Sequence, residues 1–196
     1  MREVARYADL ATTIRAAPPR CGMVRLVAID GPGGAGKSAF AARLAKALGG
    51  VPVVETDDFA SWENPHDWWD RLEADVLGPL ERGRPVRYQA YDWAARRLGD
   101  WRDMPASDTV IVEGVSSSRR ELVDRLSMAI WLETPPDQRL ARGISRDGEA
   151  LRPQWDRWMA EEDAFFERDG TRDRADLIVD GSPREPHHPN SEFITV

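Results

Sequence analysis

Residues 24–38 read Val-Arg-Leu-Val-Ala-Ile-Asp-Gly-Pro-Gly-Gly-Ala-Gly-Lys-Ser, and this is the most informative segment of the chain. Its first seven residues form a short apolar run typical of a buried strand. Residues 31–38 match the pattern GxxxxGK[ST]. Residues 37–48 are rich in Ala and Leu, as expected of a helix, and two glycines follow them. A glycine-rich loop between a strand and a helix is the context in which this pattern binds phosphate.

Each residue type in this loop has a physical role in binding phosphate. Glycine permits positive φ and lets backbone N–H groups approach the phosphates closely. The N–H groups and the helix N-terminus then provide partial positive charge. We expect ATP and Mg²⁺, with Lys37 reaching the β- and γ-phosphates and the Ser38 hydroxyl ligating the metal. The predicted nucleotide-binding residues of the loop are Gly31, Gly33, Gly34, Ala35, Gly36, Lys37, Ser38 and Ala39.

Further apolar runs alternate with helical patterns along the chain. Four more strands are expected, at residues 51–56, 109–113, 128–133 and 177–179. Helices are expected between them, at residues 66–82, 119–125, 137–146 and 155–168. Near-continuous apolar strands separated by helices favour a parallel sheet that is covered on both faces. The sequence therefore predicts an α/β, P-loop NTPase-type three-layer sandwich with about five mostly parallel strands and a helical lid.

The remaining segments complete the predicted organisation. Residues 2–17 have a loose helical stripe, and residues 84–107 are expected to be irregular because they contain breaker residues such as Pro85 and Gly99. We expect one domain over residues 1–181, with the lid at about 137–168. Residues 182–196, which contain three prolines, are expected to be a flexible tail.

Composition narrows the class of protein. The 196 residues carry a net charge of −7 and are 41% hydrophobic. This acidic balance argues against broad nucleic-acid binding, which needs a basic face. No apolar run approaches the ~18 residues that span a bilayer, and charged residues interrupt the start of the chain. Cys21 is the single cysteine, so an intrachain disulfide is excluded. We expect a cytoplasmic protein without nucleic-acid or membrane partners, for which a homodimer is one possible state.

Several motifs of other phosphate-loop proteins are missing. The chain has no Asn-Lys pair for reading guanine and no LSGGQ-like signature of transport ATPases. The predicted strand 109–113 ends in Glu113-Gly114, where motor ATPases usually have Asp-Glu. These differences favour a small-molecule kinase.

Short motifs follow the phosphate loop in a definite order. They are TDDF at residues 56–59, NPHD at 64–67, YDW at 91–93 with Arg96 and Arg97 after it, VEG at 112–114, RLAR at 139–142 with Arg146-Asp147 after it, and ADLIV at 175–179. In this order they resemble the uridine kinase group, which also includes phosphoribulokinase and bacterial pantothenate kinase. The sequence differs from the group in three places. Ala60 stands where the group has tyrosine, and an arginine follows YDW where the group has histidine. The ERGR of the group is absent after Asp147.

Two carboxylates are candidates for catalysis and for metal binding. Asp57 follows a predicted strand at the edge where ligands of open α/β sheets bind. It could accept the proton of an acceptor hydroxyl, or it could be a turn or N-cap residue. Glu113 ends another strand, which the resemblance implies lies close to the phosphate loop. A carboxylate there could hold Mg²⁺, or it could be a simple residue at a strand end.

Arg139, Arg142 and Arg146 recur at spacings of three and four, so they share one face of the predicted lid helix. Such a row could close over the phosphates, with Arg139 binding nucleotide and the other two stabilising the transferred group. The alternative is a solvated face paired with nearby acidic residues.

The acceptor site is the least marked part of the sequence. Trp62, Tyr91 and Trp93 could stack on a base or sugar, or could pack in the core. Arg96 could bind an anionic group of the acceptor, or could be surface charge. We expect a nucleoside or nucleoside-like acceptor. The alternatives are a kinase for a pantothenate-like alcohol, a sugar or a nucleoside monophosphate, and a non-catalytic ATP-binding regulator.

Overall fold

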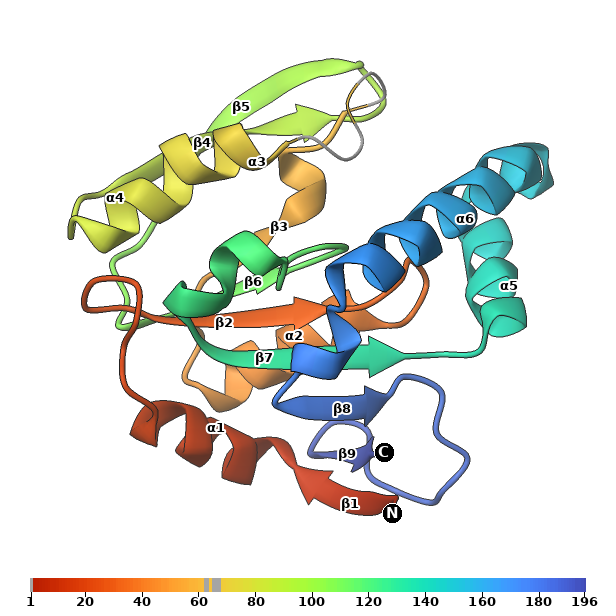
Figure 1. Cartoon of the computed structure of the whole chain (residues 1–196), viewed down its shortest axis with the longest axis horizontal. Helices are drawn as coiled ribbons and strands as arrows, with labels where there is room; N and C mark the ends of the chain where they lie inside the picture. Colours follow the sequence, from red (N-terminus) through yellow and green to blue (C-terminus); the bar gives the residue numbers. More distant parts are fainter. Residues whose placement is uncertain (1, 62–63, 65–67) are drawn as a thin grey trace.

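The computed structural model describes residues 2–61, 64 and 68–196, and Figure 1 shows them as a central sheet with helices on both faces. In this part of the chain the main sheet has seven strands in the order β1-β9-β8-β7-β2-β6-β3. The parallel strands are β2 (Arg25–Asp30), β3 (Val53–Glu55), β6 (Thr109–Glu113), β7 (Leu126–Glu133) and β8 (Leu177–Asp180). The predicted α/β sandwich with mostly parallel strands is confirmed.

Successive residues of the central strands enter two different cores. Val27, Ile29 and Ile130 face α1 (Tyr7–Ala16) and α2 (Lys37–Ala47). Their neighbours Leu26, Ala28 and Ala129 face the opposite layer of helices. Alternate side chains of a strand point to opposite faces, so an all-apolar strand such as β2 requires cover on both sides. This requirement explains the three layers.

The helical layer opposite α1 and α2, and the lid, contain helical segments of different kinds. Residues 69–81 form one continuous helical segment made of α3 (Trp69–Leu72), a π-helical turn (Glu73–Leu77) and α4 (Gly78–Glu81). Short 3-10 helices lie at Thr56–Asp58, Arg120–Arg125, Glu149–Leu151 and Arg172–Arg174. The lid consists of α5 (Pro136–Asp147) and α6 (Arg152–Asp169), which extend beyond the carboxyl ends of the strands (Figure 1).

The prediction that residues 84–107 are irregular is wrong. They contain an antiparallel hairpin of β4 (Val86–Asp92) and β5 (Arg97–Met104), which stands apart from the main sheet (Figure 1). Alternate residues of β4 are buried, including Val86 and Tyr88, whereas β5 is mostly exposed. The hairpin forms because this buried face outweighs the breaker Gly99, which lies inside β5.

The structure also corrects both ends of the chain. Residues 3–6 are not helical but form β1 (Glu3–Arg6), which pairs antiparallel with β9 (Glu192–Thr195). The tail is not flexible throughout, because β9 also pairs with β8 and lies between β8 and the edge strand β1. Its Phe193 ring packs 5.1 Å from Tyr7 and 5.2 Å from Phe40, measured between ring centroids. Neither strand has enough local pattern to be predicted, because each depends on the other.

Asp30 joins the two segments that border the carboxyl end of β2. Its carboxylate is fully buried and accepts hydrogen bonds from the backbone N–H of Gly31 (2.7 Å), Ser116 (2.9 Å) and Ser118 (2.8 Å), and from the Ser118 hydroxyl (2.9 Å). Burial raises the pKa of Asp30, and these hydrogen bonds together with the charge of Lys37 oppose the rise. The carboxylate thereby fixes the start of the phosphate loop to the segment after β6.

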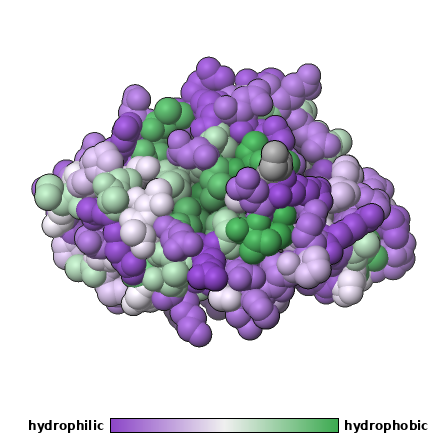
Figure 2. Space-filling view, turned by 90° about the horizontal axis from the view of Figure 1, so that it is seen from below, coloured by the Kyte–Doolittle hydropathy of each residue, from purple (hydrophilic) through white to green (hydrophobic). Residues whose placement is uncertain are grey.

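The surface is mostly hydrophilic, with hydrophobic side chains collected near the middle of the face shown in Figure 2. Val4 and Val196, near the two ends of the chain, are among the exposed large hydrophobic residues. Across residues 2–61, 64 and 68–196, no helix has both the length and the apolar character needed to cross a membrane.

Phe193→Ala tests whether the tail is part of the folded core. Phe193 is buried between two other rings, so its truncation should lower the free energy of unfolding by about 3 kcal/mol. Urea denaturation followed by circular dichroism measures the change. Val196→Ala, at an exposed tail position, serves as the control and should change stability by no more than about 0.5 kcal/mol. Equal stability of the two variants would contradict a structural role for β9.

Asp30→Ala tests the connection between the phosphate loop and the segment after β6. The change leaves three buried backbone N–H groups without their acceptor, so stability should fall by roughly 3–5 kcal/mol. Asp9→Ala, at an exposed position of α1, is the matched control. Urea midpoints that fall equally in both variants would show that the Asp30 hydrogen bonds do not hold these segments together.

Candidate functional site

The phosphate loop turns sharply between β2 and α2. Gly31, Gly34 and Gly36 have φ values of 140°, 76° and 103°, which side-chain-bearing residues rarely adopt. A Cβ atom at Gly34 would also lie 2.7 Å from the backbone oxygen of Arg139. Gly36 is the N-cap of α2, and the exposed residues Ser38 and Ala39 lie in the first helical turn. The loop therefore points backbone N–H groups and a helix N-terminus to the carboxyl edge of the sheet.

Lys37 and Ser38 link the loop to its surroundings. The buried Lys37 ammonium donates a hydrogen bond to the backbone oxygen of Pro32 (3.0 Å). The Ser38 hydroxyl donates to Oε1 of Glu113 (2.8 Å). Burial raises the pKa of Glu113, and the negative charges of Glu55 and Asp57 add to the rise. The charge of Lys37 and the Ser38 hydrogen bond oppose it. The predicted metal-binding residues therefore lie side by side next to the phosphate loop.

Ser38 and Glu113 are a chemically suitable pair for Mg²⁺, which takes oxygen ligands and keeps several waters. A hydroxyl and a carboxylate with adjacent oxygens fit a site completed by phosphate oxygens. Within the described parts of the chain, no three His, Cys, Asp or Glu side chains converge as a self-sufficient metal site. The donor set thus suits a metal that arrives with a phosphorylated ligand.

The three predicted lid arginines have different surroundings. Arg142 donates from Nη1 to the backbone oxygen of Gly34 and from Nη2 to that of Gly181, both at 3.1 Å. Arg139 is buried against Glu162 and Asp163 of α6, at 3.8 and 3.6 Å. Arg146 is largely exposed and pairs with Asp147 at 2.7 Å. The structure therefore brings Arg139 and Arg142 to the phosphate loop, whereas Arg146 pairs with Asp147 at the end of α5.

A residue that the sequence did not mark contacts the loop directly. The backbone N–H of Gly33 donates a hydrogen bond to Oε2 of Glu162 in α6 (2.9 Å). Burial raises the pKa of Glu162, and the charge of Lys37, the Gly33 hydrogen bond and the charge of Arg139 oppose the rise. Glu162 lies between Glu161 and Asp163, so no feature of the sequence separates it from its acidic neighbours.

Asp57 lies beyond the carboxyl end of β3, in the 3-10 turn Thr56–Asp58, and is exposed. The indole nitrogen of Trp93 donates to its backbone oxygen (3.1 Å). Tyr91 is buried and packs edge to face on Trp93, with 5.2 Å between the ring centroids. The pKa of Arg146 is raised first by the Asp147 hydrogen bond and also, to a smaller extent, by the charge of Asp57. Asp57 thus lies beside an aromatic pair and within electrostatic reach of the lid.

The other predicted acceptor residues are less informative. Trp62 lies outside the described residues. Arg96 occupies the turn of the β4–β5 hairpin with φ 53° and is exposed. Sequence reasoning missed the role of the neighbouring Asp58, which is buried and accepts hydrogen bonds from Tyr88 Oη (3.2 Å) and Arg102 (2.6 Å). That network holds the turn bearing Asp57 against the hairpin, and it depends on a strand pairing that the sequence did not reveal.

A cavity of about 300 Å³ opens beside the N-terminus of α2. Its walls come from five separate segments, including Gly36, Arg142 and Ser182 as well as His187 of the tail. Sequence reasoning missed the tail's part in this cavity, because folding of β9 is what returns residues 182–189 to the phosphate loop.

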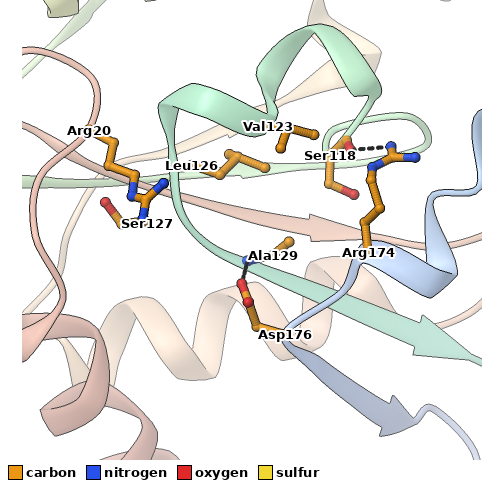
Figure 3. Close-up of a pocket in the computed structure, with 8 residues that line it drawn as sticks. All are labelled: Arg20, Ser118, Val123, Leu126, Ser127, Ala129, Arg174 and Asp176. Atoms are coloured by element: carbon orange, nitrogen blue, oxygen red, sulfur yellow. Dashed lines mark hydrogen bonds between the residues drawn. The ribbon is translucent and has the colours of Figure 1, made fainter.

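A second cavity of about 190 Å³ lies below the 3-10 helix Arg120–Arg125, near the start of β7 (Figure 3). Asp176 accepts a hydrogen bond from the Ala129 N–H (2.8 Å), and Arg174 donates to the backbone oxygen of Ser118 (3.2 Å). Arg174 also pairs with Asp169. These groups already serve to join β7, β8 and the neighbouring loops, so we assign this cavity a structural role.

Comparison with curated proteins finds relatives that share part of the chain. A uridine kinase of Schizosaccharomyces pombe is 28% identical over 145 residues, which is 63% of this chain and 32% of that protein. Inorganic pyrophosphatase TTM2 of Arabidopsis thaliana is 30% identical over 139 residues, which is 63% of this chain and 20% of that protein. The chain thus spans between a fifth and a third of the length of these relatives.

Solved structures share the fold over most of the chain. A possible uridine kinase of Bacillus stearothermophilus superposes with a TM-score of 0.64 and 21% identity, covering 88% of this chain and 96% of that one. A candidate fructose transport system kinase of Silicibacter sp. TM1040 gives 0.57 and 24% identity, covering 86% and 90%. These likenesses and the uridine kinase match confirm the predicted resemblance to uridine kinase-like P-loop kinases. A family model described as an AAA domain matches residues 27–182, and the chain belongs to that family.

Proposed function

We propose that this chain transfers the γ-phosphoryl group of ATP to a hydroxyl of a small molecule, with a nucleoside or nucleoside-like compound as the first candidate. The observation that carries the proposal is the contact of Ser38 with Glu113 at 2.8 Å. It joins the phosphate loop to β6, and β6 lies between β2 and β3 in the sheet. Asp57 follows β3, so donor and acceptor sites would meet at one edge of the sheet.

The phosphates of ATP would bind to the N–H groups of residues 33–39 and to Lys37, whereas the Gly31 N–H is held by Asp30. Arg139 and Arg142 supply further positive charge against the loop. The base and ribose would occupy the cavity of about 300 Å³, because it opens at Gly36 beside the phosphates. Mg²⁺ would be held by Ser38 and Glu113, and when bound it neutralises charge on the phosphate oxygens.

Asp57 would orient the acceptor hydroxyl and take its proton. As the acceptor oxygen bonds to the γ-phosphorus, the bond from that phosphorus to the β,γ-bridging oxygen breaks, and ADP leaves with that electron pair. Asp57 is exposed at the sheet edge, whereas Asp58 is buried and committed to Tyr88 and Arg102. The accessible carboxylate is therefore the candidate base.

An aromatic surface beside Asp57 favours an acceptor with a ring. Trp93 is fixed by its hydrogen bond to the backbone oxygen of Asp57 and by packing on Tyr91. A flat indole next to the reacting hydroxyl suits a base or sugar face. The similarity to a uridine kinase supports a nucleoside acceptor. Sugars, pantothenate-like alcohols and nucleoside monophosphates are the alternatives within the same reaction class.

ADP release from ATP and Mg²⁺ should rise when the correct acceptor is supplied from a panel of nucleosides, nucleotides, sugars and vitamin alcohols. Lys37→Ala should abolish the rise because it removes a buried phosphate ligand. Lys46→Ala, an exposed lysine at the other end of α2, should leave it unchanged. Tight ATP binding without stimulation by any acceptor would favour a non-catalytic regulator over a kinase.

Asp57→Asn should reduce the rate of phosphoryl transfer by about 10²–10⁴-fold and leave ATP affinity unchanged. The amide cannot accept the hydroxyl proton, although it preserves shape. Single-turnover kinetics with saturating ATP would measure transfer, and Asp9→Asn in α1 controls for the loss of one negative charge. A variant with full transfer activity would remove Asp57 from the mechanism.

A further inference from the structure

The Gly33–Glu162 contact places a carboxylate on a phosphate-binding amide. The Gly33 N–H donates to Glu162 Oε2 at 2.9 Å, and Glu162 is only 8% exposed. A Cβ atom at Gly33 would lie 2.9 Å from Glu162 Oε1, so the loop and the carboxylate are in close contact.

A carboxylate and a phosphate are the same kind of ligand for this loop. Both are anions whose oxygens accept hydrogen bonds from backbone N–H groups. The Gly33 amide has one hydrogen, and Glu162 already takes it at a good distance. A phosphate that bound the same N–H would meet a buried negative charge at van der Waals distance. Glu162 and the nucleotide phosphate therefore exclude each other.

Arg139 provides the second, independent observation. Its side chain is 4% exposed, and within the described residues its Nε and Nη1 atoms have no hydrogen-bond partner. The distance of 3.8 Å from Nη1 to Glu162 is too long for a hydrogen bond. A buried guanidinium with unused donors is costly unless an anion accepts from it. The backbone of Arg139 lies against the loop, since a Cβ at Gly34 would come 3.0 Å from Arg139 Cα, and its Nη1 lies 3.8 Å from the carboxylate that accepts from Gly33.

The carboxylate is carried on a firmly packed part of the lid. Trp155 of α6 packs on Gly143 of α5, where a Cβ atom would overlap the indole, and its Nε1 donates to Asp147 (3.0 Å). The two lid helices are thereby connected. Departure of Glu162 from the loop would therefore involve movement of α6 and not only rotation of a single exposed side chain.

We propose that Glu162 is an internal competitor of the nucleotide: it holds the Gly33 amide in place of a phosphate and must leave before the phosphate binds there. The entering phosphate gains the Gly33 N–H and the unused donors of Arg139. Glu162 thus sets the nucleotide affinity and assists release of the product. The proposal rests on ATP binding at the phosphate loop, which is part of the proposed function, and does not depend on phosphoryl transfer.

Isothermal titration calorimetry with Mg-ADP and with Mg-ATP tests the proposal. Glu162→Gln weakens the charge-assisted contact with Gly33, so both nucleotides should bind about tenfold more tightly than to the wild type. Glu167→Gln removes the same charge from an exposed position of α6 and should bind like the wild type. Thermal melts of all three proteins verify folding. Unchanged or weaker binding to a folded Glu162→Gln variant would overturn the proposal.

A structure of the wild-type chain with bound Mg-ADP supplies a test that needs no variant. The proposal expects a phosphate oxygen within hydrogen-bond distance of the Gly33 nitrogen and of Arg139, with Glu162 displaced. A Glu162 carboxylate that still accepts from Gly33 beside bound ADP would overturn it. Binding that behaves as expected without transfer to any acceptor would overturn only the proposed kinase activity. Failure of both nucleotides to bind either protein would overturn both proposals.

Discussion

The buried hydrogen bonds of the Asp30 carboxylate are the constraint on which the rest of the site depends. One side chain accepts four hydrogen bonds, from the first residue of the phosphate loop and from the segment that follows β6. A parallel sheet brings the carboxyl ends of β2 and β6 to the same edge, but it does not fix the loops that leave them. Asp30 does so, and it thereby sets where Ser38 meets Glu113. Satisfying a fully buried carboxylate with backbone donors gives this edge its rigidity.

The phosphate loop is surrounded by charge of both signs. Lys37, Arg139 and Arg142 lie on it together with the carboxylates of Glu113 and Glu162. Opposite charges in a poorly solvated region stabilise one another. Burial raises the pKa of both Glu113 and Glu162, and the charge of Lys37 opposes the rise in each case. The lid is therefore part of the phosphate site rather than a separate cover.

The two ends of the chain show how distant segments complete the surroundings of the phosphate loop. β1 and β9 pair with each other and extend the sheet beyond β8. Their pairing turns residues 182–189 back along α2, so that tail residues line the cavity next to Gly36. On the opposite side, the β4–β5 hairpin holds Asp58 through Tyr88 and Arg102 and supports the turn that carries Asp57. The proposed donor and acceptor sides are thus each completed by an element that is separate from the parallel strands.

The sequence alone determined the phosphate loop, the five parallel strands and the two lid helices, because each has a local pattern of glycines, apolar runs or helical spacing. It also marked Glu113 and Asp57, since residues at the ends of parallel strands meet at one edge. It did not reveal β1, β9 or the hairpin, whose residues are stabilised only by a partner strand distant in the chain. The contact of Glu162 with Gly33 and the burial of Arg139 were likewise decided by tertiary structure. A helix face has no local signal for which of three consecutive acidic residues will lie against a loop about 130 positions away.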